Sequence, residues 1–235
     1  MIFLLPFCLG TSAKAGTWEF GGAIAFGQET KGNIGANGTF PTLPYTSVQN
    51  SFKGLWYQGG LQVGYEVFRR GNWGAWIQTQ YSEGLSHPGL YHSGENYATG
   101  STITEVFNGS ATYKSHMFGI GLTRKVSFGE FGITVGPRSH NLSVVGPRQR
   151  QVNGTFTYDQ YEVRHAYQDT FVSIGFTSLQ DHPGFRSFQR FSYGTGFGST
   201  LPSVNPGATD WQMREAYLAQ FRPNQEIRIT LGVRL

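Results

Sequence analysis

The last ten residues of the chain, Glu226 to Leu235, read EIRITLGVRL and decide the fold class. Large apolar residues stand at every second position from Ile227 to Leu235, and polar or small residues stand between them. Because successive side chains of a strand point to opposite faces, this alternation predicts a β-strand with one apolar and one polar face.

The same alternation recurs along the chain and predicts an all-β protein. In each stretch one face is large and apolar, and the other carries mostly Gly, Ser, Thr and Gln with an occasional charge. Strands are expected at 17–28, 54–68, 73–82, 113–126, 130–137, 155–178, 185–194, 211–221 and 226–235.

Composition indicates which face meets the surroundings. Of the 235 residues, 38% are hydrophobic, 15% aromatic and only 14% charged, and 33 are glycine. So many aromatics with so few charges exclude a disordered chain, and no apolar run is long enough for a membrane-spanning helix. The outer face of a soluble sheet would carry Lys, Glu and Asp, which are scarce here. These features favour a closed antiparallel transmembrane β-barrel, with a soluble lipocalin-like barrel or β-sandwich as the alternative.

The number of strands does not close neatly. Nine strands are expected, whereas bacterial single-chain barrels have an even number. Either 185–194 is not a strand, since Arg186, Phe188 and Arg190 interrupt its alternation, or 155–178 splits near Gln168-Asp169. The prediction is eight strands, with ten as the alternative.

The basic excess is too scattered to indicate a nucleic-acid partner. The formal net charge is +4, and the basic residues are spread along the chain. No nucleic-acid binding is expected.

The N-terminus has the features of an export signal. The apolar start, MIFLLPFCLG, is followed by an Ala-x-Ala pattern that ends at Ala15. Residues 1–15 are therefore predicted to be a signal peptide, and 16–235 the barrel domain. Cys8 lies in the signal, so the mature chain is expected to contain no disulfide, thiolate zinc site or cysteine nucleophile.

Connections of two lengths alternate along the chain. Short turns are expected at 69–72, 127–130 and 180–184, and long polar loops at 29–51, 82–110 and 138–153. Val-Gly-Pro-Arg occurs at 135–138 and again at 145–148, which predicts a pair of strand-end turns. Short turns on one side and long loops on the other are typical of outer-membrane barrels, with periplasmic turns and extracellular loops.

With these features the chain resembles the small bacterial outer-membrane β-barrels of the OmpA-like or OmpW-like kind. The resemblance rests on the signal-like start, the alternating strands and the closing strand, and it matches no specific subfamily motif. It implies the outer membrane of a Gram-negative bacterium, outer-membrane lipids as surroundings, and recognition of the last strand by the barrel-assembly machinery. The sequence departs from the family by ending in Leu235 instead of an aromatic residue.

Aromatic residues near strand ends are expected to form girdles at the two membrane interfaces. The expected girdle consists of Trp18, Trp56, Tyr57, Trp73, Trp76, Tyr81 and Trp211.

Charges on the polar face are the strongest functional signal. Glu19, Glu66, Arg228 and Arg234 are expected to point into the lumen, where an unpaired charge is costly. We expect a structural plug of ion pairs, with a narrow polar path for small solutes as the alternative. The function predicted is structural or surface-interacting, through the loops 29–51 and 82–110.

Catalysis has one candidate, the loop that contains His92, Ser93 and Glu95. These residue types could serve a lipid-modifying barrel enzyme, but residues adjacent in sequence do not define a catalytic geometry. No catalytic residue, metal or cofactor is predicted, and the six histidines show no metal-ligand spacing.

Overall fold

The computed structural model describes residues 16–29, 55–86, 89–96, 101–108, 110–198 and 223–235. Ten β-strands make up this part of the chain. They are β1 (Trp18–Glu29), β2 (Leu55–Arg70), β3 (Trp73–Ser86), β4 (Gly89–Asn96), β5 (Ser101–Asn108), β6 (Ser110–Val126), β7 (Gly129–Val152), β8 (Thr155–His182), β9 (Phe185–Phe197) and β10 (Pro223–Arg234). None of the described residues belongs to a helix long and apolar enough to cross a membrane.

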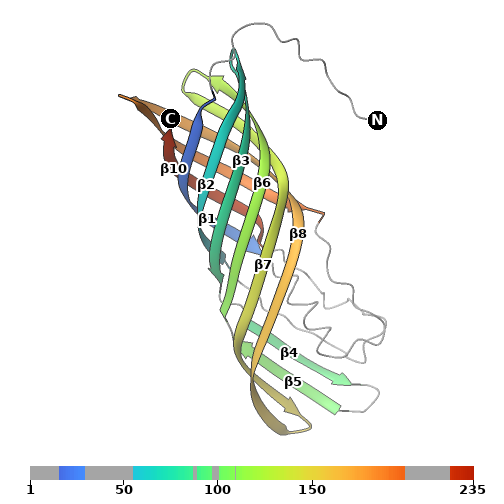
Figure 1. Cartoon of the computed structure of the whole chain (residues 1–235). Coiled ribbons are helices and arrows are strands. Elements are labelled where there is room, and N and C mark those ends of the chain that lie inside the picture. Colours follow the sequence, from blue (N-terminus) through green and yellow to red (C-terminus); the bar gives the residue numbers. More distant parts are fainter. Residues whose placement is uncertain (1–15, 30–54, 87–88, 97–100, 109, 199–222) are drawn as a thin grey trace, which may run out of the picture.

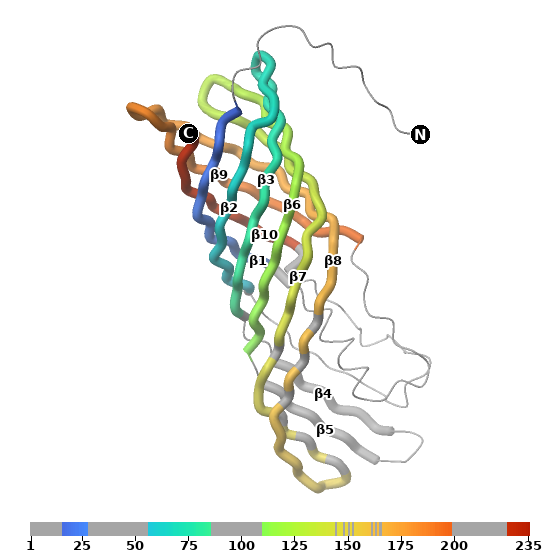
Figure 2. The backbone as a smooth tube through the Cα atoms, in the orientation of Figure 1, coloured from blue at the N-terminus to red at the C-terminus, as the bar shows by residue number. Residues whose placement is uncertain are grey.

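Eight of these strands close into a barrel (Figure 1). The ring runs β7-β6-β3-β2-β1-β10-β9-β8, all neighbours are antiparallel, and β8 pairs with β7 to complete it. The first strand lies beside the last, as the blue and red segments of Figure 2 show. The prediction of a closed antiparallel barrel with eight strands is therefore confirmed.

The paired residues around the barrel are staggered. Followed once around from Phe131 of β7 through β8, β9, β10, β1, β2, β3 and β6, the register returns to β7 at Asn141, ten residues further along. A closed eight-stranded sheet tilts its strands by roughly 35–45° and leaves an interior that side chains can fill.

The apolar face of the strands points outward. Leu61, Ile120, Phe131 and Leu231 are each more than half exposed on the outer wall, whereas their polar neighbours in the strands are buried. The outer apolar stretches of β1, β2 and β10 match the roughly 9–11 residues with which a tilted strand crosses a bilayer. The described residues thus have the inside-out polarity that the composition predicts.

Inward glycines make room for large side chains in the lumen. A Cβ on Gly194 of β9 would lie 2.1 Å from the Cζ atom of Phe171, and one on Gly232 of β10 would lie 2.6 Å from Cε1 of Phe188. Both phenylalanines are buried. At these positions glycine is therefore needed because the lumen is packed with side chains and leaves no room for a Cβ atom.

The short turns lie at one end of the barrel together with the start of β1 and the end of β10. We call this end the turn side. Gly71 and Gly184, in the β2–β3 and β8–β9 turns, have the positive φ that glycine adopts without strain. The backbone N of Trp18 donates to O of Leu235 at this end. The turns predicted at 69–72, 127–130 and 180–184 are confirmed. The opposite end is the loop side.

The structure decides between the two alternatives for the number of strands. Residues 185–194 do form a strand, β9, in which Phe188 is buried and Arg190 bonds to a carboxylate in the lumen. The alternative that 155–178 splits near Gln168-Asp169 is wrong, because β8 runs unbroken from Thr155 to His182. The expected strand at 211–221 lies outside the described residues.

Two of the predicted long loops are wrong in part. Residues 138–152 are a continuation of β7, paired with β8 up to a tight turn at Asn153-Gly154, where both residues have positive φ. Residues 82–110 contain the ends of β3 and β6 and the hairpin of β4 and β5, which pairs with the end of β7. The expected signal peptide at 1–15 and most of the loop at 29–51 lie outside the described residues.

Proline explains why the extension of β7 was mistaken for a loop. Pro137 lies where the β6–β7 pairing skips from Arg138 to Val135. Pro147 lies where β7 exchanges β6 for β5, between Val145 and Arg148. Because proline lacks a backbone N–H, it fits such interruptions of a ladder. The Val-Gly-Pro-Arg segments are therefore not strand-end turns but interruptions inside one long strand.

Candidate functional site in the barrel lumen

Glu19 on β1 is the centre of one ion-pair cluster in the lumen. Its carboxylate accepts from Nε of Arg234 at 3.0 Å and from both Nη atoms of Arg190 at 2.8 Å. Gln62 donates to the same carboxylate at 2.8 Å. The Glu19 side chain is 1% exposed, so these donors replace water as its hydrogen-bond partners.

The chain of ion pairs continues through Arg234 and Arg69. Nη1 of Arg234 donates to Glu130 at 2.8 Å, and Nη2 of Arg69 donates to the other oxygen of Glu130 at 2.8 Å. Nε of Arg69 then reaches Glu66 at 2.6 Å. Three glutamates and three arginines alternate in this turn-side network, which consists of Glu19, Glu66, Arg69, Glu130, Arg190 and Arg234.

A second cluster lies toward the loop side, and Arg138 of β7 is its centre. Its Nε and Nη2 atoms donate to Asp169 at 3.1 and 2.9 Å, in the two-pronged geometry that suits guanidinium and carboxylate. Its Nη1 atom donates to Glu226 at 3.2 Å. The guanidinium also lies 4.0 Å from the ring centre of Phe171.

Arg228 extends this cluster across the lumen. Its guanidinium donates to Glu226 at 3.0 Å and to the hydroxyl of Ser82 at 2.9 Å. Glu226 therefore lies between two arginines, and all three groups are buried.

His140 and two tyrosines complete the cluster. Nε2 of His140 lies 3.0 Å from Asp169, and Nδ1 lies within hydrogen-bond distance of the Tyr113 hydroxyl. The ring of Tyr167 stacks on His140 with centroids 4.2 Å apart. The loop-side network consists of Tyr113, Arg138, His140, Asp169, Glu226 and Arg228.

The two networks together link every strand of the barrel. The turn-side network joins residues of β1, β2, β7, β9 and β10, and the loop-side network with Ser82 joins β3, β6, β7, β8 and β10. Each network pairs equal numbers of arginines and carboxylates. Since one partner of a buried pair left alone is strongly destabilising, this pairing favours one register of the strands over a shifted one.

The four charges predicted from the sequence are divided between the two networks. Glu19 and Arg234 are in direct contact, Glu66 reaches them through Arg69 and Glu130, and Arg228 belongs to the loop-side network. The structure brings the first three together and separates Arg228 from them.

Sequence reasoning missed eight of the twelve network members, although two of these carried a signal. Glu130 and Glu226 lie at inward positions of strands that the alternation had identified, so extending the polar face by one step would have found them. Arg69 carried no such signal. The register shifts between Glu66 and Phe68, which turns Arg69 to the same side as Glu66 against the period of two.

The expected aromatic girdle is only partly on the outer wall. Trp18 and Trp73 are exposed on the turn side, and Tyr57 is exposed closer to the loop side. Tyr81 also follows the outward alternation of β3, and its hydroxyl bonds to Glu83. Trp211 lies outside the described residues.

Trp56 and Trp76 are the correction to that prediction, because both are buried in the lumen. They share the inward positions of β2 and β3 with glutamines such as Gln58 and Gln78, so the alternation excluded them from the girdle. Trp76 donates to Thr123 at 3.2 Å, and Arg234 lies 4.7 Å above its ring. Trp56 packs against a tyrosine of the loop-side network.

No group of acidic, histidine or cysteine side chains that could hold a metal ion occurs among the described residues. His92, Ser93 and Glu95 lie on β4, where the structure describes the backbone but not their side chains.

Comparison with known proteins identifies structural neighbours but no sequence relatives. No family model matches the chain, and no curated protein matches its sequence. A crystal structure of Ail, the attachment invasion locus protein of Yersinia pestis, has 12% identity and a TM-score of 0.41, over 94% of this chain and 97% of that one. A second structure of Ail, in complex with the heparin analogue sucrose octasulfate, has 11% identity and a TM-score of 0.35, over 94% of this chain and 100% of that one.

The class of protein follows from this chain's own geometry. Eight antiparallel strands close with an apolar outer wall, and the interior is filled with paired charges, glutamines and aromatic rings. This is the architecture of a small transmembrane β-barrel.

Proposed function

We propose that this chain is an outer-membrane protein that acts through a surface projection on its loop side. In the proposed orientation of the barrel in the outer membrane, the turn side faces the periplasm and the loop side faces the exterior of the cell. The support is the apolar wall, which only lipid would cover favourably, and the short turns at one end, as in barrels of this type. In this proposal, lipid and not a soluble partner covers the apolar outer wall of the barrel.

The projection is formed mainly by β7 and β8, which run beyond the other barrel strands (Figure 1). Past Ser110 of β6 and Phe197 of β9, where the barrel pairing ends, β7 and β8 stay paired up to Val152 and Thr155. The β4–β5 hairpin adds to the edge of β7. We call this four-stranded sheet the blade.

The blade is exposed to solvent on both faces at its tip, and this observation carries the proposal. Residues 153–160 are all exposed, including Phe156 at 51% and Tyr158 at 73%. Aromatic side chains are enriched at protein interfaces, and among the described residues no core packs against this tip that would need them for structure. The geometry supports a surface-binding function.

The filled lumen supports a structural barrel that does not conduct solutes. In both networks the arginines and carboxylates are paired with each other among buried side chains. Neither network therefore leaves an open charged path for solutes. The proposed role of the ion pairs is to hold the wall in register while the blade does the binding.

Two measurements test the proposal. Membrane fractionation, with comparison of boiled and unboiled samples on a gel, should place a compact, heat-modifiable band in the outer membrane. A variant that joins Val145 to Glu162, which are register partners, through an Asn-Gly turn removes the tip of the blade. It should keep the band shift but lose the adhesion of expressing cells to wells coated with glycoproteins, polyanions or cultured cells. The soluble alternative predicts purification without detergent, and unchanged adhesion after the deletion would refute the role of the blade.

A further inference from the structure

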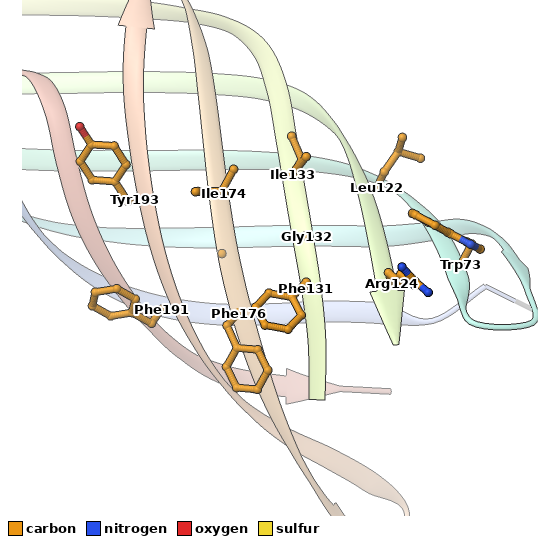
Figure 3. A pocket seen from close by; sticks show the side chains of 11 residues that line it. Trp73, Leu122, Arg124, Phe131, Gly132, Ile133, Ile174, Phe176, Phe191 and Tyr193 are labelled. Carbon is orange, nitrogen blue, oxygen red and sulfur yellow. The ribbon is translucent and has the colours of Figure 1, made fainter. Parts of the chain in front are cut away.

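The outer wall carries an apolar groove close to the turn side, shown in Figure 3. It crosses β3, β6, β7, β8 and β9 and has a volume of about 550 Å³, which lies in the size range of small-molecule sites. The backbone of Gly132 and Gly175, which are register partners, contributes to its lining.

Two rows of outward side chains border the groove, and each row follows the pairing of the strands. Phe131, Phe176 and Phe191 are successive register partners in one row. Ile133 and Ile174 are partners in the other row, which lies two residues closer to the loop side on each strand. The channel between the rows therefore runs across the strands and not along them.

The stagger of the barrel gives this groove a polar end and an apolar end. The phenylalanine row continues from Phe131 to Arg124 and then to Trp73, which is the first residue of β3 beside the β2–β3 turn. In the other direction it reaches Phe191 in the middle of β9. One end of the groove thus lies at the turn-side rim, where Arg124 provides a positive charge. The other end lies on the apolar wall, closer to the loop side.

Arg124 differs in its partners from two other exposed cations of the barrel, Lys114 and Arg186. Lys114 pairs with Glu83 at 2.8 Å, and Arg186 pairs with Asp181. Among the described residues Arg124 has no carboxylate partner, and its guanidinium lies 5.5 Å from the ring centre of Trp73. A guanidinium suits phosphate, and a tryptophan suits the interfacial layer of a bilayer.

We propose that this groove binds one anionic phospholipid, with its phosphate on Arg124 and an acyl chain between the two rows. The proposal rests on the proposed function, because it requires the wall to lie in a bilayer with the turn side at an interface. Charge at the rim and apolar surface toward the membrane interior match the two ends of a phospholipid. A soluble protein partner would have no access to a groove on this wall.

The test uses the full-length barrel folded in detergent and supplied with equal amounts of phosphatidylglycerol and phosphatidylcholine that carry identical acyl chains. Native mass spectrometry measures the lipid retained by each barrel. We expect one phosphatidylglycerol per barrel, retained at least fivefold over phosphatidylcholine. Arg124→Gln should bring the ratio close to one, and Ile174→Trp, which fills the groove, should reduce retention of both lipids.

Matched controls separate the groove from general effects. Arg186→Gln removes a rim arginine that is already paired, and Ile120→Trp enlarges an outward residue beyond the groove; both should retain lipid like the wild type. Equal retention of the two lipids by the wild type, or unchanged phosphatidylglycerol in Arg124→Gln, would overturn the proposal. A chain that gives no heat-modifiable band and does not enter vesicles would instead refute the proposed function itself.

Discussion

Replacing Arg138 with methionine tests whether the ion pairs hold the barrel together. The guanidinium is 3% exposed and donates to Asp169 twice and to Glu226 once. Methionine keeps much of the apolar stem but leaves two buried carboxylates, of which only Glu226 still has an arginine partner, Arg228. Breaking a buried pair from one side costs roughly 3–5 kcal/mol. With a urea dependence of about 1–3 kcal/mol/M, the midpoint should fall by at least about 1 M.

The measurement is a urea titration of the barrel folded into phosphatidylcholine vesicles, followed by tryptophan fluorescence and by the gel band shift. Arg164→Ala is the matched control, because Arg164 pairs with Glu162 on the blade where both side chains are exposed, at 78% and 48%. An exposed pair contributes about 0–1 kcal/mol, so the control should unfold close to the wild type.

A double variant makes the test sharper. Arg138→Met combined with Asp169→Asn removes one charge of each sign, so its loss should be smaller than the sum of the two single losses by about 1–3 kcal/mol. If Arg138→Met unfolds within 1 kcal/mol of the wild type, or no further from it than Arg164→Ala does, the reasoning about the lumen is refuted.

Three further predictions concern packing, the outer wall and conduction. Gly194→Ala should lower the unfolding midpoint, because its Cβ would overlap the ring of Phe171, whereas Gly59→Ala, with open space around it, should not; equal midpoints would contradict a packed lumen. Ile120→Arg should cost about 2–4 kcal/mol in vesicles if the wall faces lipid, while Tyr158→Arg on the blade should cost little, and a harmless Ile120→Arg would contradict a membrane-facing wall. In a planar bilayer the folded wild-type barrel should show no stepwise conductance, and regular current steps would support the small-solute path.

The fold could be predicted largely because period-two alternation is local. Inward and outward faces of the barrel strands follow from counting alternate residues, and the short turns follow from segments with turn-forming residues such as Gly71 and Asn72. The prediction failed where the local pattern stops carrying information. Where β7 extends past the apolar wall of the barrel it needs no apolar face, so residues 138–152 resemble a loop in sequence although they pair with β8 throughout.

The candidate site was predicted in kind but not in membership. The polar face predicted charges in the lumen, and Glu19 and Arg234 were among them. Their partners Arg190 and Glu130 lie on other strands, and a sequence does not state which strands meet. Trp56 and Trp76 show the converse error, since residue type was given more weight than position in the alternation.

The sequence by itself determined an inside-out β-barrel, because the residue composition of each strand face and the period of two are properties of single strands. The tertiary structure decided the stagger of ten residues around eight strands. That stagger brings Arg138 into contact with Glu226. It also places Arg124 at the turn-side end of the groove, which is tilted across the wall. Both arrangements depend on how all eight strands are paired around the barrel. No single segment of the chain contains that information.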